Sequence, residues 1–356
     1  MMNLWNNKLY QKELESIEIP NNIWERLYGK TILITGATGM VCSFLVDVLM
    51  NKNEILSVNE KISLIIPVRD MQYAEKRFLK HLGLPYFQLI QLDITNIRNE
   101  IDGFKFDYII AGAGCADPKQ FSEYPVDTMV SNLYGLTHLL DRAREYKNVR
   151  ILYISTGEIY GNAGTDIDAF KEDDSYYINS MDVRACYPNS KRAAETFCVA
   201  YFKQYNVDTV IGRLCYVYGP TIKDSDSRSV AQFLRNAAKG ENIILKSSGE
   251  QIRSYCYIVD IVSALLFLLI FGVSGEAYNI ASAECNCSIA EFAKMVAKAA
   301  GVKCVYAVAK EQDRMGYSKV LKAIQCPQKI NTLGWNAEIS LKSGIEKTVK
   351  ILNEFK

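Results

Sequence analysis

Histidine is nearly absent from this chain of 356 residues, which contains only His81 and His138. The two histidines lie far apart in the sequence, and the ten cysteines are scattered, with Cys285 and Cys287 as the only close pair. Because zinc sites draw their ligands from clustered cysteine and histidine residues, we expect no metal site. Scattered cysteines in apolar patterns indicate free thiols in a reducing compartment rather than a disulfide framework, so we expect a cytoplasmic protein.

The chain also lacks an excess of charge of either sign, since 41 Lys and Arg residues balance 40 Asp and Glu residues. Proteins that bind nucleic acid usually carry a clustered excess of basic residues, so we expect no nucleic-acid partner. Long hydrophobic runs are missing as well. The most apolar stretch, Ile261–Val273, is shorter than the roughly 20 residues that span a bilayer. The charged residues within Met1–Gly29 exclude a signal-peptide core, and we expect no membrane partner.

The length of the chain suits two domains, or one large α/β domain with a smaller lobe. Continuous apolar strands alternate with helical patterns over residues 30–219, which predicts a doubly wound parallel sheet of the Rossmann type. Short strands and helices are mixed over residues 220–356, which predicts a smaller mixed α/β lobe that binds substrate and is interleaved with the first domain. We assign to this lobe a buried helix from Val259 and a strand over Ala277–Ile280.

Met1–Gly29 is expected to form a helical extension to the large domain. Trp5 and Trp24 would anchor its packing, either against an edge of the sheet or against a partner subunit. Its function cannot be inferred from the residues.

A glycine-rich turn follows the first apolar strand, Thr31–Thr35, and a helical pattern follows the turn from Phe44 to Met50. Glycines let the backbone approach a pyrophosphate, and the N-terminus of the next helix supplies amide donors and a favourable dipole. The third glycine of the usual spacing is replaced by Cys42, a small residue that close packing of helix on strand tolerates. The residues of this turn predicted to bind a dinucleotide are Gly36, Thr38, Gly39 and Met40.

Later strands should deliver further residues to the same edge, because ligands of open α/β sheets bind beyond the carboxyl ends of the strands. The strand Ile62–Val68 ends at Arg69 and Asp70. The carboxylate would accept hydrogen bonds from the adenosine ribose of NAD, whereas the arginine could pair with the extra phosphate of NADP, so both cofactors stay open. Two more strands, within residues 89–94 and 107–114, add the following predicted cofactor residues: Asp93, Ile94, Ala111, Gly112 and Ala113.

Tyr187 and Lys191 stand four residues apart at the start of a predicted helix and so share one of its faces. A neighbouring ammonium favours the phenolate, which would bring the pKa of the tyrosine into the range of general acid–base catalysis. The helical pattern over 125–146 contains Asn132, which is either a surface amide or part of the site.

The fifth strand, Arg150–Ser155, leads into Thr156 and Glu158 at its carboxyl end. Ser155 is therefore expected to face the cofactor, and the hydroxyl of Thr156 could hydrogen-bond the reacting oxygen. Glu158 is a candidate second acid–base, with a pKa that burial would raise.

Five motifs taken together resemble the extended short-chain dehydrogenase/reductases, the family of nucleotide-sugar epimerases, dehydratases and decarboxylases. Within that family, the residues around Tyr187 are most similar to those of the UDP-glucuronate decarboxylases, and the dTDP-glucose 4,6-dehydratases are also similar. The resemblance implies a nicotinamide cofactor, with NAD the favoured of the two, a nucleotide-sugar substrate and a homodimer. The motifs are Thr-Gly-Ala-Thr-Gly-Met at 35–40, Ser-Thr-Gly-Glu-Ile-Tyr-Gly at 155–161, Tyr187 with Lys191, Tyr-Gly-Pro at 218–220 and Leu-Gly-Trp at 333–335.

The resemblance also implies roles for single residues. Tyr187 would be the base, Lys191 would hold the nicotinamide ribose, and Thr156 would orient the sugar oxygen. Glu158 would assist the second step. Arg253, with Arg228 as a weaker candidate, would bind the diphosphate of the substrate, because a guanidinium pairs with phosphate in a bidentate manner.

Three residues depart from the pattern of the family. Gly157 stands where the decarboxylases usually have Ser and the dTDP-glucose dehydratases have Asp. Tyr216, a predicted substrate residue, stands where many relatives carry a substrate-binding Asn, and Arg69 weakens the expectation of a tightly held NAD.

The leading hypothesis is an enzyme that oxidises a nucleotide-linked hexose at C4 and then decarboxylates or dehydrates it. The alternative is an NAD(P)H-dependent reductase of a 4-keto-6-deoxyhexose. A nucleotide-binding regulatory protein without turnover is a third possibility, against which the intact set of Thr156, Tyr187 and Lys191 argues.

Overall fold

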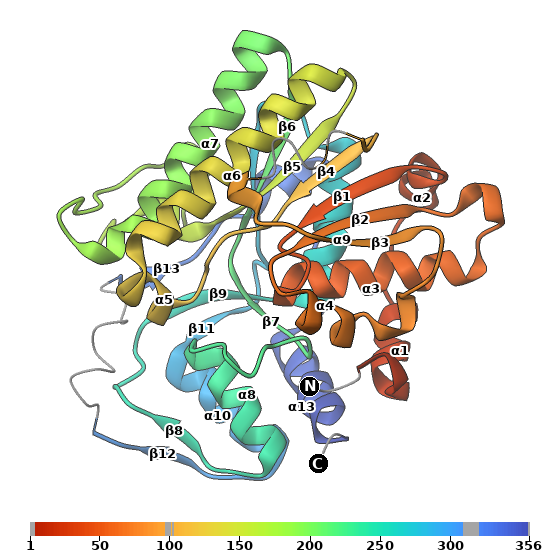
Figure 1. Ribbon diagram of the computed structural model, residues 1–356. Coiled ribbons are helices and arrows are strands. Elements are labelled where there is room, and N and C mark those ends of the chain that lie inside the picture. Colours follow the sequence, from red (N-terminus) through yellow and green to blue (C-terminus); the bar gives the residue numbers. More distant parts are fainter. Residues whose placement is uncertain (1–3, 97–100, 102, 309–319, 355–356) are drawn as a thin grey trace.

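The computed structural model describes residues 4–96, 101, 103–308 and 320–354. Its centre is a seven-stranded sheet in the order β10-β6-β5-β4-β1-β2-β3, with every neighbouring pair parallel (Figure 1). This order confirms the predicted doubly wound fold. The strands are β1 (Thr31–Thr35), β2 (Ser63–Val68), β3 (Phe87–Gln91), β4 (Tyr108–Ala111), β5 (Arg150–Thr156), β6 (Asp208–Leu214) and β10 (Ala277–Ile280).

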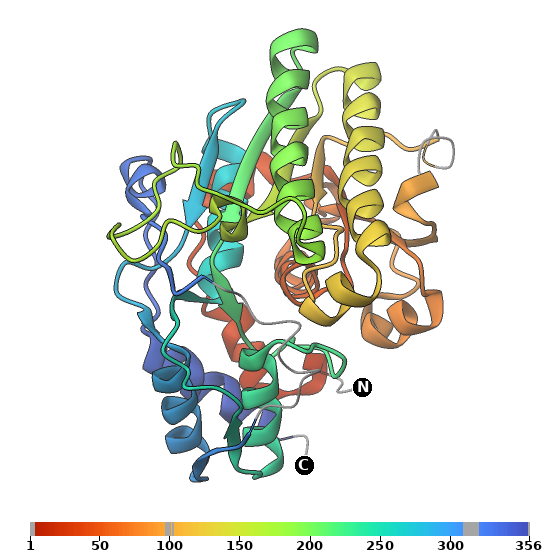
Figure 2. The same ribbon diagram turned by 90° about the vertical axis from the view of Figure 1, so that its left-hand side faces the viewer.

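Helices cover both faces of this sheet, and successive strand residues face them alternately. Leu33 lies in the core under α6 (Pro125–Tyr146) and α7 (Cys186–Tyr205), which run side by side in Figure 2. Its neighbours Ile32 and Ile34 lie in the opposite core, under α3 (Met40–Ile55) and α9 (Ile258–Phe271).

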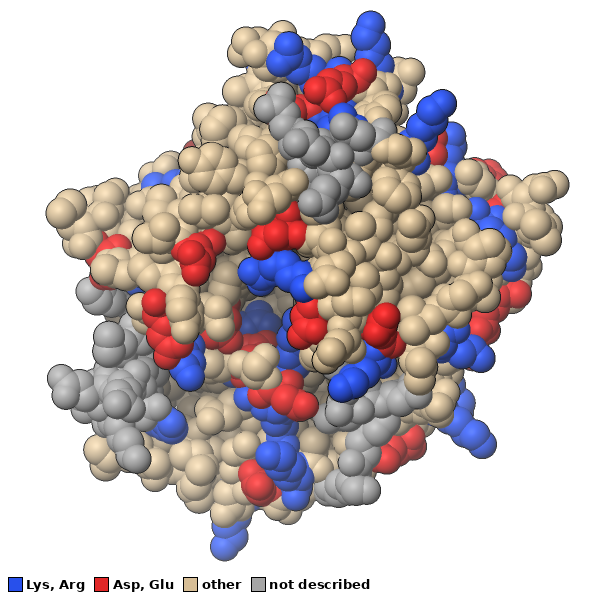
Figure 3. Space-filling model, in the orientation of Figure 1, with Lys and Arg blue, Asp and Glu red and all other residues tan. Residues whose placement is uncertain are grey.

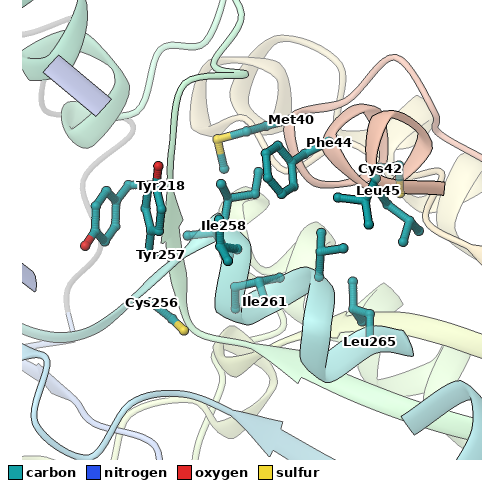
Figure 4. Close-up of a cluster of buried hydrophobic side chains, with 14 of the residues drawn as sticks. Met40, Cys42, Phe44, Leu45, Tyr218, Cys256, Tyr257, Ile258, Ile261 and Leu265 are labelled. Atoms are coloured by element: carbon teal, nitrogen blue, oxygen red, sulfur yellow. The ribbon is translucent and has the colours of Figure 1, made fainter. Parts of the chain in front are cut away.

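In Figure 4, Phe44 of α3 points toward Ile258 and Ile261 of α9, so these two helices share one apolar core. Within the described residues, no helix combines the length and the apolar composition that crossing a membrane requires.

A smaller lobe lies below the large sheet in Figure 1. Its main sheet has the order β11-β9-β13, with β7 also paired to β9, and a separate pair joins β8 to β12. The strands are β7 (Tyr216–Tyr218), β8 (Ile243–Leu245), β9 (Ile252–Tyr257), β11 (Asn286–Ser288), β12 (Cys304–Tyr306) and β13 (Lys322–Ala323). The helices of the lobe are α8 (Ser229–Lys239), α10 (Ile289–Ala300) and α13 (Leu341–Asn353).

Two segments that we assigned to the smaller lobe lie in the large layer instead. The helix from Val259 is part of α9, which packs on β5 and β6, and Ala277–Ile280 forms β10, the edge strand beside β6. A short helix, α12 (Gln328–Thr332), packs against β10. A four-residue strand carries no local signal of its partner, because the pairing is set by contacts far apart in sequence.

The N-terminal segment forms α1 (Lys8–Glu15) and α2 (Asn21–Leu27), with residues 1–3 outside the described part of the chain. Trp5 and Trp24 are buried, as expected of anchors. The helices pack on α3, α9 and α13 rather than on a sheet edge, and the Tyr10 hydroxyl donates to Asp47 at 2.5 Å. The extension therefore covers the outside of the helical layer.

Two more short helices lie at the edge of the sheet where the strands end. They are α4 (Met71–Arg77), which follows β2, and α5 (Pro118–Glu123), which follows β4.

Candidate active site

The glycine-rich turn after β1 lies directly against the end of β4. Gly36 has φ +68°, and a Cβ on it would stand 2.5 Å from the carbonyl oxygen of Gly112. Gly39 caps α3, and the amide of Ala113 donates to Thr35 Oγ1 at 3.2 Å. A close-set turn at the N-terminus of a long helix fits the pyrophosphate of a dinucleotide, because the amides there face an anion without obstruction.

Other predicted cofactor residues surround this turn. Thr38 lies within it, and the backbone carbonyl of Met40 accepts a hydrogen bond from Thr221 Oγ1 at 2.9 Å. Ala111 ends β4, and Ile94 follows β3, where it packs on Gly135 of α6.

The two predicted acidic residues have local hydrogen-bond partners. Asp70 caps α4 by accepting from the amide of Tyr73 at 2.9 Å. Asp93 Oδ1 accepts from both the amide and the hydroxyl of Thr95, at 2.9 and 2.8 Å. Each carboxylate is thereby oriented, and an oxygen remains on each for a ligand.

Arg69 is exposed at the end of β2, and a second cation reaches the same corner. Lys223 Nζ lies 5.0 Å from the ring centroid of Tyr73, which follows Asp70 in α4. Burial, and after it the charge of Arg69, lower the pKa of Lys223. Two basic side chains therefore flank the place where the adenosine ribose is expected.

Lys191, on α7, is buried and reaches the end of β5. Its Nζ donates to the carbonyl of Ile154 at 2.8 Å and stands 4.6 Å from the ring centroid of Tyr153. Burial lowers the pKa of Lys191 to about 8, although Glu195 acts in the opposite direction. A buried ammonium at a strand end is well placed to hold a ribose hydroxyl.

Tyr187 is buried, and the predicted lowering of its pKa by Lys191 is wrong. Burial, followed by the charge of Glu158, raises the pKa of Tyr187, while a hydrogen bond with Thr156 and the charge of Arg228 act to lower it. Desolvation of a phenolate outweighs the attraction of a cation, and the ammonium of Lys191 is itself turned to a backbone carbonyl. Tyr187 is therefore a phenol at neutral pH.

Glu158 forms an ion pair with Arg184 that the sequence reasoning missed. The pair is bidentate, with nitrogen–oxygen distances of 3.0 and 3.1 Å, and both side chains are partly exposed to the cavity. Arg184 stands three residues before Tyr187, and that spacing was the only signal in the sequence. The pair fixes the carboxylate of Glu158 beside the phenol of Tyr187.

A cavity of about 260 Å³ lies between the end of β5, the start of α7 and the smaller lobe. Figure 3 shows a hollow near the centre of the face drawn in Figure 1, with basic and acidic side chains gathered around it. Of the seven residues predicted to act in catalysis or substrate binding, all but the buried Lys191 line the cavity: Thr156, Glu158, Tyr187, Tyr216, Arg228 and Arg253.

The two arginines predicted to bind phosphate differ in their partners. Arg228 forms a bidentate pair with Asp226, so its charge is already matched. Arg253 is 2% exposed and donates to the backbone carbonyls of Ile252, Val320 and Leu321, at 2.7 to 3.3 Å. Within the described residues no carboxylate pairs with Arg253, which favours it over Arg228 as the site of an anion.

Ser155 and Asn132 are both engaged by buried partners. The hydroxyl of Ser155 donates to Glu195 at 2.5 Å, and Glu195 pairs with Arg213 at 2.7 Å beneath the site. Asn132 is 1% exposed and donates to Ser190 Oγ at 2.9 Å, so it is not a surface amide. The expected contact of Ser155 with the cofactor stays a prediction.

One lining residue comes from near the C-terminus and had no signal in the sequence. Gln325, two residues after β13, reaches the cavity beside Gly157. No group of three or more His, Cys, Asp or Glu side chains that could hold a metal ion occurs in the part of the chain that the structure describes.

Comparison with known proteins places the chain in a family. Residues 32–281 match the model of the NAD dependent epimerase/dehydratase family. The chain is 30% identical to UDP-glucuronic acid decarboxylase 1 of Xenopus tropicalis over 326 residues, which are 90% of this chain and 71% of that protein. It is 34% identical to UDP-glucuronic acid decarboxylase 6 of Arabidopsis thaliana over 240 residues, which are 67% of this chain and 65% of that protein.

Solved structures have the same fold at lower identity. The dTDP-glucose 4,6-dehydratase of Bacillus anthracis, in complex with NAD, is 20% identical, with a TM-score of 0.75 over 91% of this chain and 97% of that one. The UDP-glucose 4-epimerase of Thermotoga maritima, with UDP-glucose, is 22% identical, with a TM-score of 0.77 over 91% and 99%. The family resemblance read from the motifs is thus confirmed, and this chain belongs to the NAD-dependent epimerase/dehydratase family of the extended short-chain dehydrogenase/reductases.

Proposed function

We propose that this chain oxidises a nucleotide-linked hexose at C4 and then decarboxylates or dehydrates the resulting ketone. The observation that carries the proposal is the convergence of Thr156, Tyr187 and Glu158 on one cavity wall, with Lys191 buried behind it. The relatives named above, which decarboxylate UDP-glucuronic acid or dehydrate dTDP-glucose, support it.

The nicotinamide cofactor would accept a hydride from C4 and later return it. The turn at Gly36 and Gly39 would hold its pyrophosphate, and Lys191 would hold its ribose. Tyr187 would take the proton of the C4 hydroxyl. The hydroxyl of Thr156 would be hydrogen-bonded to the C4 oxygen and to the phenol oxygen of Tyr187. Because its pKa is raised, Tyr187 is protonated at neutral pH and must first lose its proton to solvent. The resulting phenolate would be a strong base for the proton of the C4 hydroxyl, and the phenol so formed would give that proton back to the C4 oxygen when the hydride returns.

The ketone at C4 determines what happens next. It makes a carboxylate at C6 part of a β-keto acid, which can lose carbon dioxide. Alternatively, it acidifies the proton at C5, which Glu158 could remove as water leaves from C6. The ion pair with Arg184 holds Glu158 in place for this second step.

NAD is the proposed cofactor, because Asp70 lies two residues after the end of β2, where a ribose hydroxyl would need an acceptor. NADP is a second candidate. The two cations near Asp70, Arg69 and Lys223, favour it because they could pair with the extra phosphate of NADP. Titration of the protein with each cofactor would separate them. Tighter binding of NADP that is lost in Arg69→Ala would overturn the choice of NAD.

Net reduction of a 4-keto-6-deoxyhexose is the second candidate function. In that reaction Tyr187 would act as the acid, a role that its raised pKa favours, and reduced cofactor would be consumed. Incubation with UDP-glucuronate and with dTDP-glucose, followed by mass spectrometry, tests the main proposal. If the products show no loss of carbon dioxide and no loss of water, the main proposal is rejected. Loss of absorbance at 340 nm with a 4-keto sugar would establish the reductase.

A homodimer and a cytoplasmic location complete the proposal. Exposed apolar side chains on the outer faces of α6 and α7, such as Tyr134 and Phe197, support an interface there, and ten free cysteines suit a reducing compartment. Light scattering of the purified chain would test the dimer.

A further inference from the structure

Gln325 lies in the wall of the cavity, although it comes from near the C-terminus. Its side chain is 4% exposed and lines the cavity with Thr156, Gly157 and Glu158. Its backbone amide donates to Ser254 Oγ at 3.0 Å, which fixes the segment after β13 against β9. A polar side chain is thus held rigidly among the residues proposed to carry out the chemistry.

The orientation of the Gln325 amide follows from its partners. The side-chain nitrogen donates to the backbone carbonyl of Arg213 at 3.1 Å and to Asn279 Oδ1 at 3.0 Å. A peptide carbonyl can only accept, so the atom that faces Arg213 must be the nitrogen. The hydroxyl of Tyr160 also donates to Asn279 Oδ1, at 2.6 Å. Both hydrogens of the Gln325 amide are therefore used, and its oxygen points the other way.

The oxygen of this amide lies against Gly157. A Cβ built on Gly157 would stand 2.5 Å from Gln325 Oε1 and 2.8 Å from its Cδ, too close for any side chain. The absence of a side chain at Gly157 is what makes room for the amide. Within the described residues, no donor is hydrogen-bonded to Oε1, so this acceptor is available to a ligand.

We propose that Gln325 contacts the sugar of the substrate and selects a hydroxyl over a carboxylate at the carbon that faces Gly157. The inference rests on the proposed function. A sugar hydroxyl can donate to Oε1, whereas an ionised carboxylate can only accept and would be repelled by it. Under the proposed function Thr156 faces the C4 oxygen and Glu158 acts at C5 as water leaves C6, so the inference takes the carbon that faces Gly157 to be C6. The chain therefore prefers a neutral hexose to a uronic acid, and the dehydration branch to decarboxylation.

Isothermal titration of the full-length protein with UDP, UDP-glucose and UDP-glucuronate tests this directly. We expect UDP-glucose to bind more tightly than UDP-glucuronate. Gln325→Ala should weaken the binding of UDP-glucose by about tenfold, the usual effect of one hydrogen bond, and leave the affinity for UDP unchanged. The preference for glucose over glucuronate should shrink by the same factor.

The outcomes separate this inference from the proposed function. If the wild type binds none of UDP-glucose, dTDP-glucose and UDP-glucuronate, the proposed function fails, and the inference with it. If UDP-glucose binds but Gln325→Ala leaves its affinity unchanged, only the inference fails. The same holds if Gln325→Ala weakens the binding of UDP as much as that of UDP-glucose. A wild type that prefers UDP-glucuronate would also overturn it.

A second pair of variants tests the shared space without any ligand. Gly157→Ser should lower the melting temperature, because the new side chain displaces the Gln325 amide from its partners. Adding Gln325→Ala should bring the double variant back to the melting temperature of Gln325→Ala alone. Gly103→Ser, at a glycine with open space around it, is the matched control and should change nothing. Additive effects of the two substitutions would contradict the contact.

Discussion

Phe121 stacks on Tyr187, with ring centroids 4.4 Å apart and ring planes 11° from parallel. Phe121 belongs to α5, whose capping residue Asp117 accepts from the amide and the hydroxyl of Ser227 at 2.7 and 2.6 Å. The ring of the proposed acid–base residue is therefore fixed by a helix that is itself tied to the smaller lobe. The ring of Tyr187 serves to position its hydroxyl, which is the group proposed to transfer the proton.

Tyr187→Phe should abolish turnover and keep the fold. The phenyl ring can still stack on Phe121, so the melting temperature should stay near that of the wild type. Loss of a general acid–base group should lower kcat by about 10²- to 10⁴-fold, with the affinity for NAD and nucleotide sugar nearly unchanged. Tyr255→Phe is the matched control, because the buried hydroxyl of Tyr255 has no hydrogen-bond partner among the residues that the structure describes. Wild-type turnover in Tyr187→Phe would refute the proposed role.

Arg184→Met should impair the second chemical step more than the first. Without the guanidinium, Glu158 loses its bidentate partner and its fixed position beside the cavity. We expect kcat to fall by about tenfold, as for a lost charge-assisted hydrogen bond, while the 4-keto intermediate accumulates. Mass spectrometry of quenched reactions would detect this intermediate, and Arg184→Lys should restore part of the rate. A uniform loss of all steps would instead indicate disturbed folding.

The glycine-rich turn after β1 could be predicted from sequence because its signal is local. Gly36 and Gly39 follow a strand and precede a helix, and the turn between them is determined within a few residues. Tyr187 and Lys191 likewise share one helix. The pKa of Tyr187 could not be predicted, because burial decides it, and burial depends on residues such as Phe121 that are distant in the sequence.

Gln325 was missed for a related reason. Nothing near it in the sequence indicates a site, and the role proposed for it depends on the lack of a side chain at Gly157, which directly follows β5 and lies far earlier in the chain. The placement of β10 beside β6 is also a long-range pairing, so the four residues Ala277–Ile280 could not reveal it by themselves.

Arg253→Lys and Arg228→Met should have different effects. Among the described residues, Arg253 donates to backbone carbonyls and pairs with no carboxylate. Its replacement by lysine should weaken UDP binding by about 10- to 100-fold with a small change in stability, because an ammonium cannot replace the planar fork. Arg228→Met leaves Asp226 without its partner and should lower the free energy of unfolding by about 1–3 kcal/mol, since the pair is only partly exposed. Titration with UDP and denaturant unfolding would separate the two. Unchanged UDP affinity in Arg253→Lys would exclude a phosphate contact there.

Lys191 should make both stability and activity depend on pH above neutrality. Its pKa is lowered by burial from 10.5 to about 8, so the unfolded chain binds more protons than the folded one between these values, and stability attributable to Lys191 rises with pH there. Below pH 8 the ammonium is charged in both the folded and the unfolded chain, so its burial lowers the free energy of unfolding by the largest amount. Lys191→Met should therefore raise the free energy of unfolding at pH 7 by up to about 3 kcal/mol, less the lost hydrogen bond to Ile154, and the gain should shrink toward pH 10. Turnover of the wild type should decline above pH 8 as the ammonium is lost. The residual activity of Lys191→Met should not show this decline. A stability difference that is constant from pH 7 to pH 10 would mean that Lys191 titrates normally and is not desolvated in the folded protein.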